Sequence, residues 1–498
     1  MKTNRRQFLK LLGLIVISPL LKACDVIFGT PTATPTLTST LPLTDTPSPT
    51  GTSTPLSETP TETPTQTLTE TPTQTPTSVA GDYFNIHPFI EAHPEAVFIK
   101  RTSVPVKTDA QAKYSAGFEF AQEIFVYGTT AGIPLSHKIA IKANVTYTEG
   151  TGNTAAGMGI VTDRHFTEGL IEGMKGLGFQ AQDMYLREGN WLRDGYCPTD
   201  LMYTGYVEMA DATGINSLYF PSGRRITDLT LKDLQEGTEI VWKETSSGVV
   251  FKRIGYVSPY NQGDSWLLNV SKFKAHGMGM TLCAKNLQGV CASPHVRFCE
   301  GVDATMEHPE YILKDFQPNF GDHITRLHAQ HLAAGFPRWD RPGGGYSSGY
   351  GMETWAQRTC DSLSMTNIGL NVIEGIYGRN GNGFVSGPGP DGKAEDFMTN
   401  ILIFGKDPFR VDIIGIWLSG HEPGNFGLFH IAKERGLSNV LNPREIPVYL
   451  WDKDNPQPTS LNNFERVPLV TTYLRRDYNG QTEAQYHLVD EPFDYSSF

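Results

Sequence analysis

The sequence has few cysteines, no excess of positive charge and few long apolar runs. Its six cysteines include no Cys-x-x-Cys pair, so an iron–sulfur cluster is not implied. The net charge of -12 argues against a nucleic-acid partner and against a broad electrostatic attraction to anionic lipid. Gly157-Met158-Gly159 lacks the third glycine of a dinucleotide-binding fingerprint, which argues against NAD. No internal repeat of fixed period is present.

The first residues have the pattern of an export signal. A twin-arginine motif, Arg5-Arg6-Gln7-Phe8-Leu9-Lys10, precedes an apolar run over residues 11–21. That run is shorter than the ~20 residues of a comfortable membrane span. Leu21-Lys22-Ala23-Cys24 resembles a bacterial lipobox, so residues 1–24 are predicted to be a lipoprotein signal with lipid attached at Cys24. An uncleaved anchor helix is the alternative, because Lys22 departs from the usual small or aliphatic residue.

Both interpretations place the protein at the outer face of the cytoplasmic membrane, with the lipid bilayer as a partner. Residues 25–80 consist mostly of Thr, Pro and Ser and have no apolar periodicity. Such a segment cannot bury enough surface to offset its ordering entropy, so we expect a disordered, semi-rigid stalk. Residues 81–498 are then one folded domain.

Apolar segments of strand length alternate with segments of helical periodicity in this domain. Strands are expected over residues 96–100, 138–144, 184–186, 217–219, 370–373, 400–404 and 446–450, and helices over 109–125, 162–177, 199–213, 412–418 and 425–435. This alternation predicts an α/β fold, a mostly parallel sheet flanked by helices. Residues 239–242, 249–256 and 265–270 follow one another through short turns and predict an inserted set of antiparallel strands.

Polar residues stand where several of these strands end. Lys142 and Asn144 end one strand, and Thr162 or Asp163 is placed to begin the next helix. Since ligands bind at the carboxyl ends of strands in α/β sheets, we expect these residues on one rim. A helix amino terminus adds free N–H groups that favour an anion. The alternative is that the lysines pair with acidic neighbours at the surface.

The stretch from residue 270 to 289 concentrates reactive side chains among small residues. Lys274, His276, Lys285 and Asn286 lie here between glycines and alanines that let a ligand approach the backbone closely. Histidine suits proton transfer, and lysine supplies a cation or a covalent nucleophile. We therefore predict His276 and Lys285 as catalytic residues. The plainer interpretation is a solvated basic turn before a surface helix.

These motifs occur in an order that resembles a known family. The elements are Lys142-x-Asn144, Lys274-x-His276, Thr281-x-x-x-Lys285-Asn286-x-x-Gly289, Gly387-Pro388 and Gly405-x-Asp407-Pro408-x-x-x-Asp412. Over about residues 138–450 they are similar to the bacterial and archaeal family called domain of unknown function 362. The sequence departs from the family's pattern at Glu374-Gly375, where an aspartate is usual, and carries long insertions between residues 289 and 370. The family name implies no settled chemistry.

Two further elements have structural and functional interpretations. Asp407 is placed to cap a helix with Pro408 at its first position, whereas Asp412 lies one turn further and is predicted to reach the rim as a ligand-binding residue. Cys283, Cys291 and Cys299 recur every eight residues, a spacing better explained by a disulfide or buried thiols than by a metal. Among His323, His328 and His331, the last two share a helix face, so either a two-histidine metal site or structural histidines fit.

The sequence thus predicts an enzyme that acts on a small anionic molecule. The ligand-binding residues expected beside His276 and Lys285 are Lys142, Asn144, Thr162, Lys274, Asn286 and Asp412. The alternative is a non-catalytic binding protein for an anion or a metal, which needs only complementary charge. The sequence identifies neither a cofactor nor a metal.

Overall fold

The computed structural model describes residues 82–128, 131–145, 158–189, 204–292, 295, 310–343, 348–380, 394–467, 469 and 492–497. The expected signal, Cys24 and the expected stalk lie outside these residues, as do the glycine-rich loop around residues 149–157 and Gly387-Pro388. All described residues belong to one compact unit, Ala80–Phe498. Within the described residues, no helix has both the length and the apolar character needed to cross a membrane.

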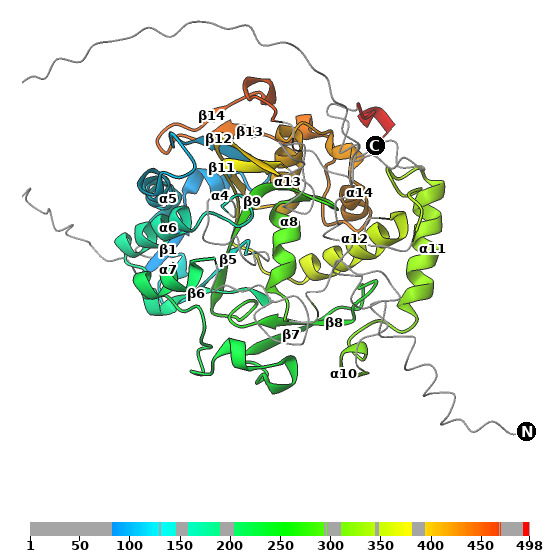
Figure 1. Ribbon diagram of the computed structural model, residues 1–498, viewed down its shortest axis with the longest axis horizontal. Coiled ribbons are helices and arrows are strands. Elements are labelled where there is room, and N and C mark those ends of the chain that lie inside the picture. The colour runs from blue at the N-terminus through cyan, green and yellow to red at the C-terminus, as the bar shows by residue number, and fades with distance from the viewer. Residues whose placement is uncertain are drawn as a thin grey trace, which may run out of the picture. The chain divides into compact units, whose positions relative to one another are not determined.

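A nine-stranded sheet forms the centre of the part of this unit that is described (Figure 1). Its strands are β2 (Val97–Arg101), β5 (Lys138–Ala143), β6 (Met184–Leu186), β9 (Ser265–His276), β10 (Gly279–Thr281), β11 (Leu370–Asn380), β12 (Glu395–Gly405), β13 (Val448–Leu450) and β14 (Gln457–Pro458). The order across the sheet is β14-β13-β2-β12-β11-β9-β5-β6, and β10 pairs with β9 as a hairpin.

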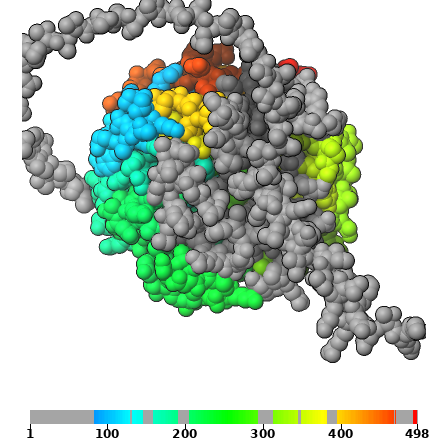
Figure 2. Space-filling model, viewed as in Figure 1, coloured from blue at the N-terminus to red at the C-terminus, as the bar shows by residue number. Residues whose placement is uncertain are grey.

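Most of these strands run in one direction. The strands β2, β5, β6, β9, β11 and β13 are parallel to one another, and β10, β12 and β14 run the opposite way. The prediction of a mostly parallel sheet is therefore confirmed. The pairing of β2 with β13 joins distant parts of the chain. Figure 2 shows early residues, in blue, beside late residues, in orange, on one face of the molecule.

Helices cover both faces of the sheet. They are α4 (Pro88–Ala92), α5 (Ala110–Ile124), α6 (Arg164–Gly176), α7 (Tyr206–Thr213), α8 (Cys283–Asn286), α10 (Glu310–Leu313), α11 (Phe320–Ala333), α12 (Gly349–Ser364), α13 (Pro408–Leu418) and α14 (Gly427–Glu434). Figure 1 shows α5 and α6 on one side of the sheet and α8 and α13 on the other. The helices α5 and α6 approach closely because Gly117 and Gly169 lack side chains: a Cβ there would lie 2.0 Å from the Phe166 carbonyl oxygen and 1.9 Å from that of Tyr114.

Aspartates begin three of these helices. Asp109 accepts the N–H of Ala112 at 2.9 Å at the start of α5, and Asp163 caps α6. Asp407 caps α13 with Pro408 at the first turn, as predicted. These side chains satisfy backbone N–H groups that have no partner within the helix. The expected helices over residues 109–125, 162–177, 412–418 and 425–435 are confirmed, with small shifts at their ends.

Two of the three expected inserted strands form an antiparallel pair, although their bounds differ from the prediction. The third, residues 265–270, was placed wrongly, because it is part of β9, which pairs parallel with β5 and β11 in the main sheet. The strands β7 (Ile240–Glu244) and β8 (Arg253–Val257) pair with each other in a separate two-stranded sheet. The expected strand over residues 249–256 starts late because the Asp361 carboxylate accepts the N–H groups of Val249, Val250 and Phe251, which are then unavailable to a strand partner. The expected strand at residues 217–219 is wrong, since Tyr219 makes only an isolated bridge to Arg225.

A second small sheet was not expected. The strands β1 (Tyr83–Ile86), β3 (Phe125–Gly128) and β4 (Ile133–Pro134) pair antiparallel in the order β3-β1-β4. Its inner residues Phe84 and Phe125 pack edge to face with Trp266 at the start of β9. The small sheet therefore covers the amino-terminal end of the main sheet.

Candidate functional site

The carboxyl ends of β5 and β9 carry most of the predicted residues. Lys142, Asn144, Lys274, His276, Lys285 and Asn286 are called the strand-end site below. Its position follows from strand register, because Lys142 on β5 lies opposite Asn269 on β9, which in turn lies opposite Asn371 on β11. A row of polar side chains therefore crosses three parallel strands in an otherwise apolar core.

Hydrogen bonds join the lysine and amides of this row. Lys142 Nζ donates to Glu188 Oε2 at 2.8 Å, to Asn286 Oδ1 at 2.9 Å and to the Ala143 carbonyl at 2.7 Å. Asn286 also accepts from Asn144 Nδ2 at 3.1 Å, and it donates to Asn269 Oδ1 at 2.8 Å. Three of the predicted residues, separated by up to 144 positions in the chain, are thus directly bonded to one another.

The ion pair of Lys142 and Glu188 is buried, and this burial shifts the pKa of both groups. Burial lowers the pKa of Lys142, against the raising effect of Glu188. Burial likewise raises the pKa of Glu188, against the effect of Lys142. Removing water disfavours the charged form of each group, and their mutual attraction restores part of the loss.

The strand β9 presents three basic side chains on one face. Lys272, Lys274 and His276 are two residues apart, and alternate residues of a strand point to the same side. Lys272 donates to Glu374 Oε2 at 2.7 Å, and its amine lies 3.4 Å from the centre of the Tyr377 ring. Both charged groups of this ion pair are inaccessible to solvent. Glu374, where the resemblance led us to expect an aspartate, is therefore the counter-ion of Lys272.

A second buried ion pair lies beside the first. Asp163 Oδ2 accepts from Lys113 Nζ and from the Tyr377 hydroxyl, each at 2.6 Å, and the Asp163 N–H donates to Glu374 Oε2 at 3.0 Å. Burial alone would raise the pKa of Asp163, but Lys113 and the hydroxyl donor outweigh it and lower that pKa. Asp163 thus both caps α6 and fixes the amino end of this helix to the sheet.

Cations concentrate around Lys274 and His276. Burial lowers the pKa of Lys274 well below its usual range, and Lys285, Arg379, Lys272 and Lys142 lower it further. Burial, then Lys285 and Lys274, likewise lower the pKa of His276 well below 6.5. Although protein atoms surround His276 closely, its side chain is partly exposed to solvent, and so is that of Lys285. These two groups are the accessible members of the cluster.

A hydrogen bond to His276 identifies which ring nitrogen carries the proton in the neutral imidazole. Its Nδ1 accepts the backbone N–H of Met278 at 3.0 Å. Because a backbone N–H can only donate, the proton of the neutral ring is on Nε2. The imidazole therefore presents an N–H donor at Nε2, which suits the binding of an anionic oxygen.

Two predicted ligand-binding residues have structural roles in this arrangement. Asp412 accepts the N–H groups of Cys283 and Ala284 at 2.7 and 2.8 Å, so it holds the start of α8, the turn that carries Lys285 and Asn286. Burial raises the pKa of Asp412 to about 7, against these two donors. Thr162 donates to the Val270 carbonyl at 2.8 Å and accepts from the Asn144 N–H, which joins the chain before α6 to β5 and β9.

The metal interpretations receive little support from the described residues. No group of three or more His, Cys, Asp or Glu side chains among them is arranged to hold a metal ion. His331 lies between Glu353 and Glu434 at 2.6 and 2.8 Å, whereas His328 contacts the Trp339 carbonyl, so the two histidines have separate partners. The thiols described, Cys283, Cys291 and Cys360, are free and buried, and Cys197 and Cys299 lie outside the described residues.

Several charged groups of this region were not predicted from the sequence. They are the counter-ions and ring that surround the lysines: Lys113, Asp163, Glu188, Glu374 and Tyr377. The alternation of β9 could have placed Lys272 with Lys274 and His276, since the three are spaced by two residues. No local pattern marks Glu188 or Glu374, because buried and solvated carboxylates look the same in a sequence.

Fold and site together define an α/β protein with a cationic cluster at the carboxyl ends of its central strands. The model of the family described as Domain of unknown function (DUF362) matches residues 139–417, which include the entire strand-end site. The chain belongs to this family. No curated protein and no solved structure matches the chain.

Proposed function

We propose that this protein binds a small anionic molecule, a carboxylate or a phosphate, at the strand-end site and acts on it as an enzyme at the outer face of the cytoplasmic membrane. The observation that carries the proposal is the set of cations acting on Lys274, namely Lys285, Arg379, Lys272 and Lys142. Bringing like charges together at a buried amine costs electrostatic free energy. The carboxylates paired with Lys142, Lys272 and Arg379 offset part of that cost, and a bound anion lowers it further.

The accessible groups have distinct tasks in this proposal. His276 donates from Nε2 to an anionic oxygen, and Lys285 provides the cation beside it. Asn286 Oδ1 accepts from the Lys142 amine and from Asn144 Nδ2, and these bonds orient the floor of the site. Once substrate is bound, His276 and Lys285 are the side chains that we propose for the catalytic step.

Binding without turnover is the second candidate function. It is favoured by the hydrogen bond from the Met278 N–H to His276 Nδ1, because a ring already protonated at Nε2 has no free lone pair there to accept a proton. The two functions differ in the fate of the ligand. Mass spectrometry of the retained molecule before and after incubation with fresh protein separates them: conversion identifies an enzyme, and unchanged recovery identifies a binding protein.

The test uses the full chain purified from its own exported pool. Elemental analysis and mass spectrometry identify what is retained, and titration with inorganic phosphate, pyrophosphate and citrate measures anion binding. His276→Ala and Lys285→Ala are each expected to weaken binding at least tenfold with little change in melting temperature. Lys453→Ala, at an exposed lysine outside the cluster, is the matched control. Wild-type affinity in both site variants would refute the anion site.

The membrane attachment is tested separately. We propose that lipid on Cys24 holds the protein at the membrane, on the basis of the twin-arginine motif and the lipobox-like segment. Cys24→Ala is expected to release the protein from the membrane fraction or to leave it as an unprocessed precursor. A variant that is processed and remains membrane-bound would contradict the lipid anchor and leave the anion site unaffected.

A further inference from the structure

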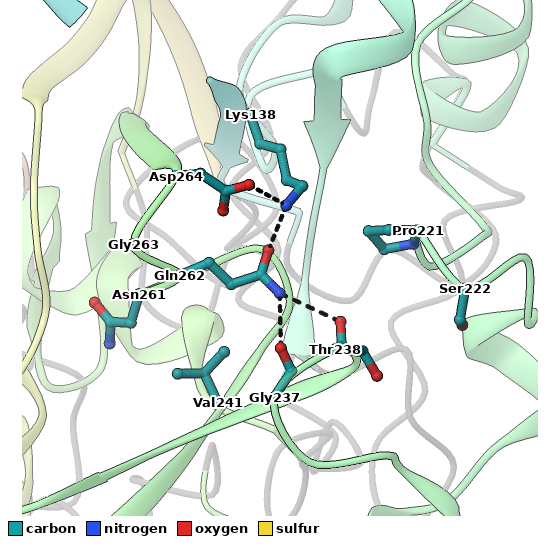
Figure 3. A pocket seen from close by; sticks show the side chains of 10 residues that line it. All are labelled: Lys138, Pro221, Ser222, Gly237, Thr238, Val241, Asn261, Gln262, Gly263 and Asp264. Carbon is teal, nitrogen blue, oxygen red and sulfur yellow. Dashed lines mark hydrogen bonds and ion pairs between the residues drawn. The ribbon is translucent and has the colours of Figure 1, made fainter. Parts of the chain in front are cut away.

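A cavity of about 580 Å³ opens at the other end of the same two strands. Lys138, the first residue of β5, lines it, together with the loop 261–264 that leads into β9 (Figure 3). The opposite wall comes from residues 221–222, from the turn at 237–238 and from Val241 on β7. Its volume is in the roughly 300–1,000 Å³ range of small-molecule pockets. The twelve residues of β9 place it roughly 36 Å from His276.

A buried amide that is bonded through its oxygen alone, within the described residues, lines this cavity. Asn261 is 5% exposed, and its Oδ1 accepts the backbone N–H of Asn367 at 2.8 Å. That bond fixes the orientation of the amide, because only the oxygen can accept. Among the residues that the structure describes, none accepts a hydrogen bond from the nitrogen of the same side chain. A buried donor left unsatisfied costs about 1–3 kcal/mol, so a ligand oxygen that draws this nitrogen toward the cavity is favoured.

The walls around this amide are held in place by other hydrogen bonds. Gln262 accepts from Lys138 Nζ at 3.1 Å and donates to the carbonyls of Gly237 and Thr238 at 3.2 and 3.4 Å (Figure 3). The Ser222 hydroxyl donates to the buried Glu239 at 2.5 Å and keeps its oxygen as an acceptor. The loops are therefore connected before any ligand arrives, which reduces the ordering cost of binding.

The charge of the lining disfavours an ion. Its cation, Lys138, is neutralised by Asp264 at 2.6 Å, and the Asp264 side chain is more than half exposed. The remaining polar groups are amides, hydroxyls and backbone carbonyls, and Pro221 and Val241 provide small apolar surfaces. Such a lining offers polar groups without net charge. It matches a molecule whose hydroxyls both donate and accept.

We propose that this cavity is a second ligand site, for a neutral, hydroxyl-rich molecule such as a monosaccharide or disaccharide. In this site Asn261 Nδ2 donates to a ligand oxygen, and the exposed oxygen of Asp264 accepts from a ligand hydroxyl. Pro221 and Val241 contact the carbon face of the sugar ring. The site is independent of the strand-end site and of the reaction proposed there.

The test is titration of the full chain with maltose, cellobiose and N-acetylglucosamine, followed by saturation-transfer NMR and calorimetry. Glucuronate and glucose 6-phosphate serve as charged counterparts of similar size. At least one neutral sugar is expected to bind at millimolar concentration or below, and more tightly than its charged counterpart. No binding of any neutral sugar, or tighter binding of the charged ones, would overturn the proposal.

Two variants locate the binding in the cavity. Gly263→Trp fills the space, since no atom of the described residues lies within 4 Å of a Cβ at Gly263, and is expected to weaken sugar binding at least tenfold. Gln111→Trp, at an exposed position on α5, is the matched control and should bind as the wild type does. Asn261→Asp keeps the acceptor for the Asn367 N–H and removes the free donor, so it too should weaken binding. Wild-type affinity in both Gly263→Trp and Asn261→Asp would refute the assignment.

Discussion

The two ends of β5 and β9 hold ion pairs of nearly the same length in opposite environments. At the carboxyl end, Lys272 and Glu374 lie 2.7 Å apart with neither side chain exposed. At the amino end, Lys138 and Asp264 lie 2.6 Å apart, with 22% and 55% of their side chains exposed. The distance is alike, but water screens only the second pair. Burial, and not bond length, therefore decides what each pair contributes.

This difference extends to the chemistry that each end supports. The carboxyl end gathers buried cations whose charges act on one another, an arrangement suited to an anion. The amino end neutralises its lysine and surrounds an open cavity with amides and hydroxyls. One pair of strands thus separates a charged site from a neutral one. The following predictions test that separation, beginning with the largest expected effect.

Removing the buried counter-ion should be the most damaging change. Glu374→Gln keeps the size of the side chain but leaves the Lys272 ammonium without its carboxylate in a site with no solvent access. Breaking a buried ion pair from one side costs about 3–5 kcal/mol in free energy of unfolding. Urea denaturation measures this loss.

A double variant provides the control for that experiment. Lys272→Met combined with Glu374→Gln removes both charges and keeps an amide oxygen as acceptor for the buried Asp163 N–H, so it is expected to recover most of the stability. If Glu374→Gln alone unfolds at the wild-type urea concentration, the buried pair is not what stabilises this end of the sheet.

The second prediction concerns the aspartate that holds α8. Asp412→Ala leaves the N–H groups of Cys283 and Ala284 buried without acceptors, so we expect a loss of about 2–4 kcal/mol in unfolding free energy. Asp412→Asn keeps one acceptor and should lose less. Anion binding should weaken as well, since Lys285 and Asn286 are on the same turn. Unchanged binding by a folded Asp412→Ala protein would show that α8 does not position the site.

The third prediction uses pH to separate the two ligand sites. A lysine is charged only below its pKa, and burial with neighbouring cations places the pKa of Lys274 well below 10.5. Affinity for pyrophosphate should therefore fall as pH rises through that lowered pKa, by about tenfold, or about 1.4 kcal/mol, for loss of one charge. Sugar binding in the cavity should change less than about twofold over the same range.

His276 adds a second pH dependence, at acid pH, to the affinity for pyrophosphate. Its pKa is depressed below 6.5, so the ring is neutral near pH 7 and gains charge only as pH falls through the folded-state value. Pyrophosphate affinity should rise there, and bound pyrophosphate should raise the pKa of His276 measured by NMR. Calorimetry at pH 5 to 10 tests both pH dependences. Affinity independent of pH would contradict the placement of these groups at the anion.

Much of the site could be predicted from the polar residues that stand at strand ends. Lys142 and Asn144 follow an apolar strand and Asn286 follows a second one, and the structure joins all three by hydrogen bonds. This could be predicted because parallel strands end on one side of a sheet. The same reasoning predicted the α/β fold, whereas the small sheet β3-β1-β4 was missed because its strands are only two to four residues long.

The counter-ions could not be predicted for a different reason. Glu374 is 102 positions from Lys272, and only the pairing register of β11 with β9 brings the two opposite each other. A register is a property of the assembled sheet, and a sequence does not display it. For Asp412, the predicted helix position was right, but the side chain meets the buried start of α8. Which face that helix position presents depends on packing partners that are distant in the chain.

The smallest effect is expected at the exposed ion pair of the amino end. Lys138→Met should lower the free energy of unfolding by less than about 1 kcal/mol, since exposed pairs gain little and salt screens them. The hydrogen bond from Lys138 lowers the pKa of Asp264 below 3.8. The pair therefore contributes stability above that value and loses it as pH falls through the folded-state pKa. The difference between wild type and Lys138→Met, measured by urea denaturation at pH 7 and pH 3 and at low and high salt, should be small throughout and smallest at low pH or high salt. A loss comparable to that of Glu374→Gln would mean that water does not screen this end of the strands, and the contrast between the two ends would no longer hold.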